Sequence, residues 1–196
     1  MMYLNERIDD LQRGGLRVIQ RADAFRFGTD AVLLADFAAP RRHDRVCDLG
    51  TGTGIIPLLL YARENTISAD AVEIQPDMAD MAARSMAMNG LNEKIRVLPG
   101  DLRSIRTLLP HARYDLVTCN PPYGKAGGTL LNPDASKRLA RHEESCAIED
   151  VACAAAWLLQ NGGRLCCVFP AARMIELSDA MRKYRMAPKR IRMVHS

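Results

Sequence analysis

Val46-Cys-Asp-Leu-Gly-Thr-Gly-Thr-Gly54 is the stretch of sequence that decides the fold. Its first four residues are typical of a short buried strand, and the glycines that follow are typical of a tight turn. These glycines have a G-x-G-x-G spacing, not the G-x-G-x-x-G spacing of dinucleotide-binding loops, because position 55 is Ile. Glycine accepts positive φ and lets the backbone approach a ligand closely. The stretch therefore predicts a strand and a ligand-binding turn, with a plain turn or a nicotinamide dinucleotide site as alternatives.

Short apolar runs typical of strands alternate with helical patterns along the chain after this turn. We expect strands at residues 46–49, 70–74, 95–98, 114–119 and 164–169, a sixth strand beginning at 190–194, and helices near 55–63, 76–88, 149–160 and 171–184. Strands separated by helices imply right-handed βαβ units and a mostly parallel sheet that is covered on both faces. The predicted fold is α/β, a Rossmann-like doubly wound sheet with ligand sites at the carboxyl ends of its strands.

Two segments depart from this alternation. Within residues 1–45, residues 16–20 and 25–27 could pair as a hairpin, and 31–37 is helical in pattern. Residues 124–142 are rich in Gly, Lys, Asn and Pro without periodicity, which is typical of a binding loop that is mobile without its substrate. The chain has 196 residues, enough for one α/β domain. We therefore expect a single domain over 1–196, with the Rossmann-like core at 46–196.

Composition excludes several classes of protein. The chain is 48% hydrophobic and 26% charged, has no apolar run of bilayer-spanning length, and begins without a secretory signal, so we expect a cytoplasmic protein. It has no C-x-x-C pair and its histidines are scattered, which argues against a metal site. The net charge of +4 is weak evidence for a nucleic-acid partner. Two basic clusters, at residues 137–142 and 182–192, could contact phosphates or could be solvated surface.

Acidic residues follow or end three successive predicted strands. In the first, Asp48 could order the turn of Gly50, Thr51, Gly52 and Gly54 near a positively charged ligand. Glu73, followed by Ile74, could accept hydrogen bonds from both hydroxyls of a ribose. Nicotinamide dinucleotide enzymes use an acid in the same way, so this residue does not distinguish the two kinds of ligand. Asp101, followed by Leu102, could accept a hydrogen bond from an adenine amino group or could be an ordinary helix cap. Three acids in these places suit one nucleoside that carries a positive sulfonium, as S-adenosylmethionine does.

Asn120-Pro121-Pro122-Tyr123 ends the fourth predicted strand. Two consecutive prolines remove two N–H donors, so the Asn120 side chain and the Pro121 carbonyl are held as a pair of acceptors. A planar amino group offers two donors to match this pair, and accepting both of its hydrogens frees the nitrogen lone pair for attack on a methyl group. Tyr123 could stack on a planar substrate. We expect Asn120, Pro121, Pro122 and Tyr123 to be the catalytic residues of a methyltransferase that acts on amino nitrogens.

Taken together, the glycine turn, Glu73, Asp101 and the Asn-Pro-Pro-Tyr motif resemble the class I S-adenosylmethionine-dependent methyltransferases that act on amino nitrogens. Three N-terminal stretches, at residues 6–11, 15–20 and 25–35, and Arg141-His142-Glu143 are similar to the bacterial tRNA-valine adenine-N6 methyltransferase family. This resemblance covers essentially the whole chain. It implies S-adenosylmethionine as cofactor, tRNA as partner, and residues 1–45 as a hairpin and helix that cover the cofactor, with Thr29 and Asp30 among its contacts.

The resemblance leaves other interpretations open. Protein glutamine-N5 methyltransferases of release factors share the two motifs but usually carry a separate helical N-terminal domain. Guanine-N2 methyltransferases of ribosomal RNA more often have Phe after the two prolines. A nucleoside-binding Rossmann domain without catalysis would leave Asn120 and Tyr123 without a purpose. Class I enzymes also end in an antiparallel hairpin, which is expected to be incomplete here because the sequence stops at Ser196. The oligomeric state cannot be predicted.

Overall fold

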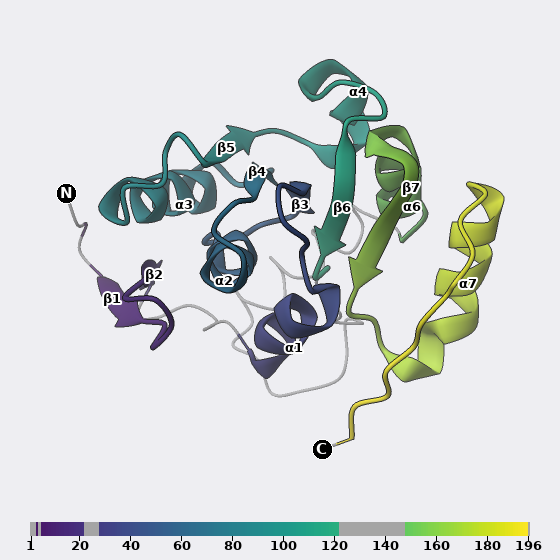
Figure 1. Cartoon of the computed structure of the whole chain (residues 1–196), viewed down its shortest axis with the longest axis horizontal. Helices are drawn as coiled ribbons and strands as arrows, with labels where there is room; N and C mark the ends of the chain where they lie inside the picture. The colour runs from purple at the N-terminus through teal and green to yellow at the C-terminus, as the bar shows by residue number, and fades with distance from the viewer. Residues whose placement is uncertain (1–2, 4, 22–27, 122–147, 196) are drawn as a thin grey trace.

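The computed structural model describes residues 3, 5–21, 28–121 and 148–195 (Figure 1). Its elements, in chain order, are β1 (Glu6–Asp10), β2 (Arg17–Arg21), α1 (Thr29–Ala38), β3 (Arg45–Leu49), α2 (Ile55–Arg63), β4 (Ser68–Glu73), α3 (Pro76–Met88), β5 (Ile95–Pro99), η1 (Leu102–Ser104), α4 (Ile105–Leu108), β6 (Tyr114–Cys119), α6 (Ile148–Leu158), β7 (Leu159–Cys167), η2 (Ala171–Arg173) and α7 (Met174–Lys183). None of the helices within these ranges is long and apolar enough to cross a membrane.

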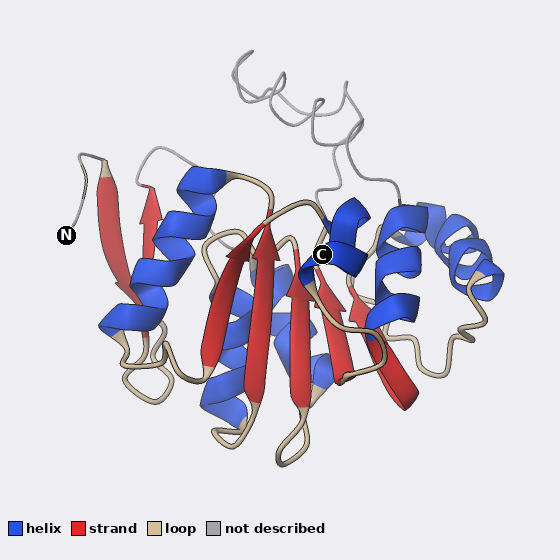
Figure 2. Ribbon diagram, turned by 90° about the horizontal axis from the view of Figure 1, so that it is seen from above, coloured by secondary structure: helices blue, strands red, loops and turns tan. Residues whose placement is uncertain are grey.

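The main sheet has five strands in the order β5-β4-β3-β6-β7, and every pair is parallel. Figure 2 shows their arrowheads pointing the same way. From β3 the chain builds outward through β4 to β5, then returns to the other side of β3 as β6. The strand order therefore reverses between β3 and β6, which is where open α/β sheets bind ligands at their carboxyl ends. The predicted α/β, doubly wound fold is confirmed.

Two apolar cores cover the two faces of this sheet, because successive side chains of a strand point to opposite faces. Val46 of β3 and Leu116 of β6 belong to a core that also holds residues of α1, α2 and α3. Cys47 and Val117, one position further along the same strands, belong to a second core with residues of α4, α6 and α7. Helices thus cover both faces of the sheet. A ligand site is therefore expected at the carboxyl edge, which these helices leave uncovered.

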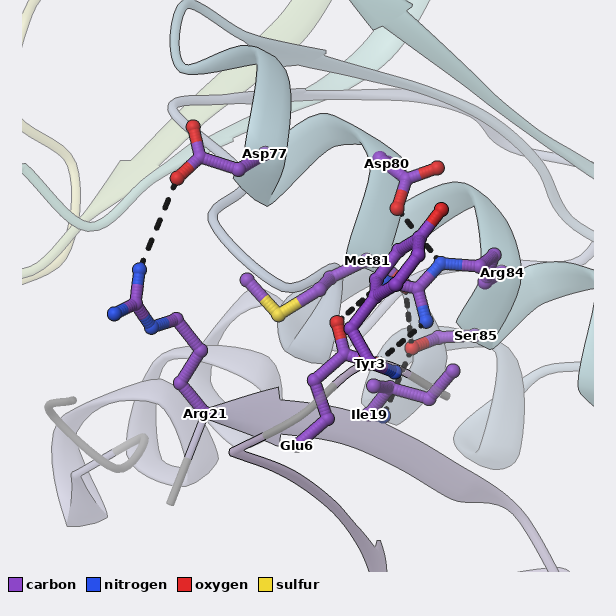
Figure 3. Close-up of polar contacts among 9 residues, drawn as sticks. All are labelled: Tyr3, Glu6, Ile19, Arg21, Asp77, Asp80, Met81, Arg84 and Ser85. Carbon is purple, nitrogen blue, oxygen red and sulfur yellow. Dashed lines mark hydrogen bonds and ion pairs between the residues drawn. The ribbon is translucent and has the colours of Figure 1, made fainter. Parts of the chain in front are cut away.

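The N-terminal hairpin is a correction to the sequence analysis. Residues 16–20 do lie in a hairpin, but β2 pairs antiparallel with β1, with Ile8 opposite Ile19; residues 25–27 lie outside the described residues. The pairing was not predicted because β1 is mostly charged and lacks the apolar pattern of a strand. The hairpin docks on α3, where the Ser85 hydroxyl accepts the N–H of Ile19 at 2.9 Å and the Arg84 guanidinium binds both carboxylate oxygens of Glu6 at 2.8 and 2.6 Å (Figure 3).

The expected sixth strand at residues 190–194 is also wrong, because no residue of 186–195 is in a strand or helix. This segment instead contacts α1. The Arg190 guanidinium lies 4.1 Å from the centroid of the Phe37 ring, and Arg192 pairs with Asp36 at 3.0 Å. β7 is consequently an edge of the described sheet. It also begins earlier than expected: Gly162 and Gly163, predicted to end a helix, lie inside β7 beside an irregularity in its pairing with β6.

Candidate functional site

Most of the predicted site residues gather at the carboxyl edge of the sheet. Asp48 is the next-to-last residue of β3, Glu73 ends β4, Asp101 follows β5, and Asn120 follows β6. The parallel register aligns these ends, since Leu49 lies opposite both Val72 and Cys119. The neighbouring strands thus bring residues from four separate parts of the sequence to one edge.

The glycine turn between β3 and α2 uses backbone conformations that favour glycine. Gly50, Gly52 and Gly54 have φ of 69°, 58° and 83°. A Cβ at Gly54 would lie 2.5 Å from Met86 Cε, so this glycine allows α3 to pack against the turn. A Cβ at Gly50 would have no atom within 4 Å. The turn therefore packs tightly at one end and is open at Gly50, as a ligand that lies on the backbone requires.

Glu73 holds this turn in place. Its buried carboxylate accepts the backbone N–H of Gly52 at 2.8 Å through Oε2 and that of Gln75 at 2.9 Å through Oε1. This structural role was not expected from the sequence. Each carboxylate oxygen has further acceptor capacity, so the predicted ribose contact stays compatible with these bonds. The next side chain, Ile74, is 42% exposed, an apolar surface that a planar ligand could cover.

Asp48 is fully buried and only partly satisfied. Its Oδ1 accepts the Thr118 hydroxyl at 2.6 Å, whereas Oδ2 has no hydrogen-bond partner among the described residues, and neither has the buried Thr51 hydroxyl. Burial raises the pKa of the Asp48 carboxyl to about 7, against the opposing effects of the nearby Thr118 and Thr51 hydroxyls and with a further increase from the charge of Glu73. Thr118 was not predicted as a site residue, although a polar residue inside an apolar strand is a signal that could have indicated it.

Asp101 caps η1, which was the alternative to an adenine contact at this position. Its Oδ1 accepts the N–H of Arg103 at 2.8 Å at the start of η1, and its Oδ2 binds the Arg103 guanidinium at 2.6 Å. The hydrogen bonds and charge of Arg103 hold the pKa of this carboxyl below its ordinary value. Leu102 packs, partly buried, against the second core. The predicted contact of Asp101 with an adenine amino group therefore has to share a carboxylate that Arg103 already binds.

Asn120 meets the N-terminal helix. Its side-chain Nδ2 donates to Asp30 Oδ2 at 2.9 Å, so residues that lie 90 positions apart form one unit. Thr29 begins α1, and Pro121 is half-buried beside Asn120. The predicted residues Pro122 and Tyr123 lie outside the described residues, as does the loop at 124–142. The edge thus combines an oriented amide, buried acceptors that have no partner within the described ranges, and an open glycine turn, which suits a ligand with donor groups and positive charge.

Comparison with known proteins shows which family and which relatives this chain resembles. A family described as the methyltransferase small domain matches residues 22–189. A protein of Porphyromonas gingivalis named tRNA1(Val) (adenine(37)-N6)-methyltransferase is 34% identical over 178 residues, covering 88% of this chain and 69% of that protein. A protein of Tolumonas auensis with the same name is 38% identical over 148 residues, covering 75% of this chain and 60% of that protein.

Solved structures give the same picture of the fold. A predicted O-methyltransferase from Agrobacterium tumefaciens, protein Atu636, has a TM-score of 0.61 and 26% identity, covering 77% of this chain and 66% of that one. TrmN from Thermus thermophilus has a TM-score of 0.58 and 26% identity, covering 77% of this chain and 40% of that one.

Proposed function

Because the chain belongs to the methyltransferase small domain family, in the group of the tRNA1(Val) (adenine(37)-N6)-methyltransferases, we propose that it methylates the exocyclic amino nitrogen of adenine 37 in tRNA1(Val). The cofactor of this family is S-adenosylmethionine, and the chain is an S-adenosylmethionine-dependent methyltransferase. The observation that carries the proposed reaction is the placement of Asn120 at the end of β6, oriented by a carboxylate, across the switch point from the glycine turn. A tRNA substrate places the enzyme in the cytoplasm.

The residues at the carboxyl edge fit S-adenosylmethionine. Asp48 Oδ2 and the Thr51 hydroxyl are buried without hydrogen-bond partners in the described part of the chain, so each can bind a donor group of the cofactor. The open space at Gly50 allows the ligand to lie against the backbone. We assign the cofactor to a set of positions on α1 and at four strand ends, namely Thr29, Asp30, Asp48, Gly50, Thr51, Gly52, Gly54, Glu73, Ile74, Asp101, Leu102 and Asn120.

When bound, the cofactor would supply an electrophilic methyl group on its sulfonium sulfur; as the new N–C bond forms, the S–C bond would break to leave a neutral sulfide, and one amino hydrogen would be lost as a proton to solvent. Asn120 Oδ1 and the Pro121 carbonyl accept the two hydrogens of the adenine amino group, and this draws the nitrogen lone pair out of the ring system and toward the methyl. From the sequence alone we expect Pro122 to stiffen the backbone beside these acceptors and Tyr123 to stack on the base. The adenine must leave its stack to reach this edge, which costs little in a single-stranded loop.

The test is to incubate the protein with labelled S-adenosylmethionine and, in separate reactions, total tRNA, ribosomal RNA or a release factor, then digest the labelled RNA to nucleosides. The proposal expects label in tRNA as N6-methyladenosine. Label in the release factor alone would favour the glutamine-N5 reaction, and label in ribosomal RNA as methylguanosine would favour the guanine reaction.

Asn120→Ala separates the reaction from cofactor binding. We expect this variant to lose methyl transfer and to bind S-adenosylmethionine with nearly unchanged affinity in calorimetry. Asn92→Ala, a change of the same residue type at an exposed position outside the site, is the matched control and should behave as wild type. A fully active Asn120→Ala variant would refute the mechanism, and binding of NAD in place of S-adenosylmethionine would refute the cofactor.

A further inference from the structure

The contact between Asn120 and Asp30 determines which way the Asn120 amide faces. An ionised carboxylate only accepts hydrogen bonds, so the group that lies 2.9 Å from Asp30 Oδ2 is the amide nitrogen. Oxygen and nitrogen occupy opposite branches of a planar amide. With the nitrogen directed to Asp30, the oxygen of Asn120 faces away from α1 and is fixed as an acceptor.

Asp30 is itself held firmly. It lies in the first turn of α1, and the neighbouring residues Ala31, Leu34 and Ala35 are buried in the first core. Its Oδ1 is buried and has no hydrogen-bond partner among the described residues. The carboxylate folds back over Gly28, where a Cβ would lie only 2.3 Å from Asp30 Oδ1. Gly28 has φ of −83°, a conformation open to any residue, so the glycine is explained by the space that the Asp30 carboxylate occupies.

We propose that Asp30 is a positioning residue for the methyl transfer: it binds the Asn120 nitrogen so that the Asn120 oxygen is presented to the substrate amino group. This inference rests on the proposed function and refines the assignment of Asp30 to the cofactor. An Asn120 amide rotated by half a turn would present a donor to a donor and could not bind the amino group. Asp30, on the N-terminal helix α1, therefore orients one of the two acceptors of the Asn-Pro-Pro-Tyr motif from outside that motif. Gly28 leaves the space that the Asp30 carboxylate occupies.

Asp30→Asn tests the proposal with almost no change in shape. An amide at this position can donate as well as accept and carries no charge, so it no longer dictates the orientation of Asn120. We expect kcat at saturating S-adenosylmethionine and tRNA to fall by roughly 10- to 100-fold, the effect of losing a hydrogen bond to a charged group. The dissociation constant for S-adenosylmethionine should change less than threefold. Asp36→Asn, the same substitution on the exposed side of α1, is the control and should keep the wild-type kcat.

Gly28→Ala provides a second variant in which Asp30 and Asn120 are both retained. Its methyl group would displace the Asp30 carboxylate, and we expect a kcat loss in the same direction without a change in thermal stability beyond that of Asp30→Asn. A loss of less than fivefold in Asp30→Asn would overturn the proposal. It would also be overturned by a loss that appears in cofactor affinity while kcat at saturation is retained, or by an equal loss in Asp36→Asn.

A spectroscopic measurement keeps this test independent of the substrate. The side-chain NH₂ resonances of Asn120 can be identified by their absence in Asn120→Ala, and the proposal expects Asp30→Asn to shift them and Asp36→Asn to leave them in place. Unshifted resonances in Asp30→Asn would overturn the inference even if tRNA is methylated. If the wild-type protein methylates no tRNA, the proposed function fails, and shifted resonances would still support the contact that orients Asn120.

Discussion

The carboxylate of Glu73 accepts the backbone N–H of Gly52 at 2.8 Å, and this bond joins the end of β4 to the glycine turn after β3. The turn and the acid were predicted as separate contacts of one ligand. The structure shows that they are also bound to each other, so a change at Glu73 acts on the ligand directly and through the turn.

Glu73→Gln should therefore weaken both binding and stability. One of the two backbone N–H groups now bound would face the amide NH₂ of the new side chain, leaving a donor unsatisfied at a cost of roughly 1–3 kcal/mol in the free energy of unfolding. We expect the S-adenosylmethionine dissociation constant to rise at least tenfold in calorimetry, with the stability loss visible in urea unfolding. Glu93→Gln, at an exposed position, is the control. Wild-type affinity in Glu73→Gln would contradict a cofactor role for this residue.

Two glycines with nearly the same φ allow the effect of backbone strain on stability to be distinguished from the effect on cofactor binding. Gly50 and Gly90 have φ of 69° and 68°, and a Cβ at either would have no atom within 4 Å. An alanine at either position should cost roughly 1–2 kcal/mol of unfolding free energy, because an L side chain is strained there. Only Gly50→Ala places a methyl group on the open side of the glycine turn, so only this variant should lose S-adenosylmethionine affinity, by tenfold or more. Equal S-adenosylmethionine affinities of the two variants would contradict the proposal that the cofactor lies against the backbone at Gly50.

Local patterns predicted much of the fold. The apolar run at residues 55–63 coincides with α2, and Pro76 begins α3 as expected. The errors occur where partners distant in sequence decide the structure. β1 is polar and forms because its hairpin docks on α3 through Arg84 and Ser85. The segment at 190–194 has strand-like composition but lies on α1 through its arginines.

The site could be predicted only in part for the same reason. Asp48 and Glu73 lie near the ends of predicted strands and Asn120 follows one, and the topology of a parallel sheet brings such positions to one edge. Their partners could not be derived this way. The bond from Glu73 to Gly52 and the bond from Asn120 to Asp30 depend on side-chain directions, which strand and helix patterns do not contain.

The buried carboxyl of Asp48 should make stability depend on pH. Its pKa is raised to about 7 by burial, whereas an aspartate in an unfolded chain titrates near ~3.9. Between these values the folded protein keeps a proton that the unfolded chain has released, so the free energy of unfolding falls as the pH rises. The Asp48 contribution is fully present below about pH 4 and is lost above about pH 7.

Asp48→Asn removes this titration. Urea unfolding of the cofactor-free protein at several pH values should show wild type losing stability relative to the variant, by on the order of a few kcal/mol between about pH 4 and 7, with no further change above. A difference between the two proteins that is independent of pH would contradict the raised pKa.

The ion pair between Arg84 and Glu6 should hold the hairpin on α3. The two side chains are only 18% and 6% exposed, and the guanidinium also binds Asp80 and lies 4.7 Å from the centroid of the Tyr3 ring (Figure 3). Removing one partner leaves a largely buried charge unpaired, so we expect Arg84→Gln to lose roughly 2–4 kcal/mol of unfolding free energy.

Arg96→Gln breaks a pair with Asp70 in which the arginine is 61% exposed, and should lose less than about 1 kcal/mol. Adding Glu6→Gln to Arg84→Gln should restore part of the loss, since it removes a carboxylate charge that has lost its ion-pair partner and keeps, among the described residues, only the N–H of Tyr3. Equal losses in Arg84→Gln and Arg96→Gln would mean that the hairpin is held by its backbone contacts to Ser85 and Asn89 and not by this ion pair.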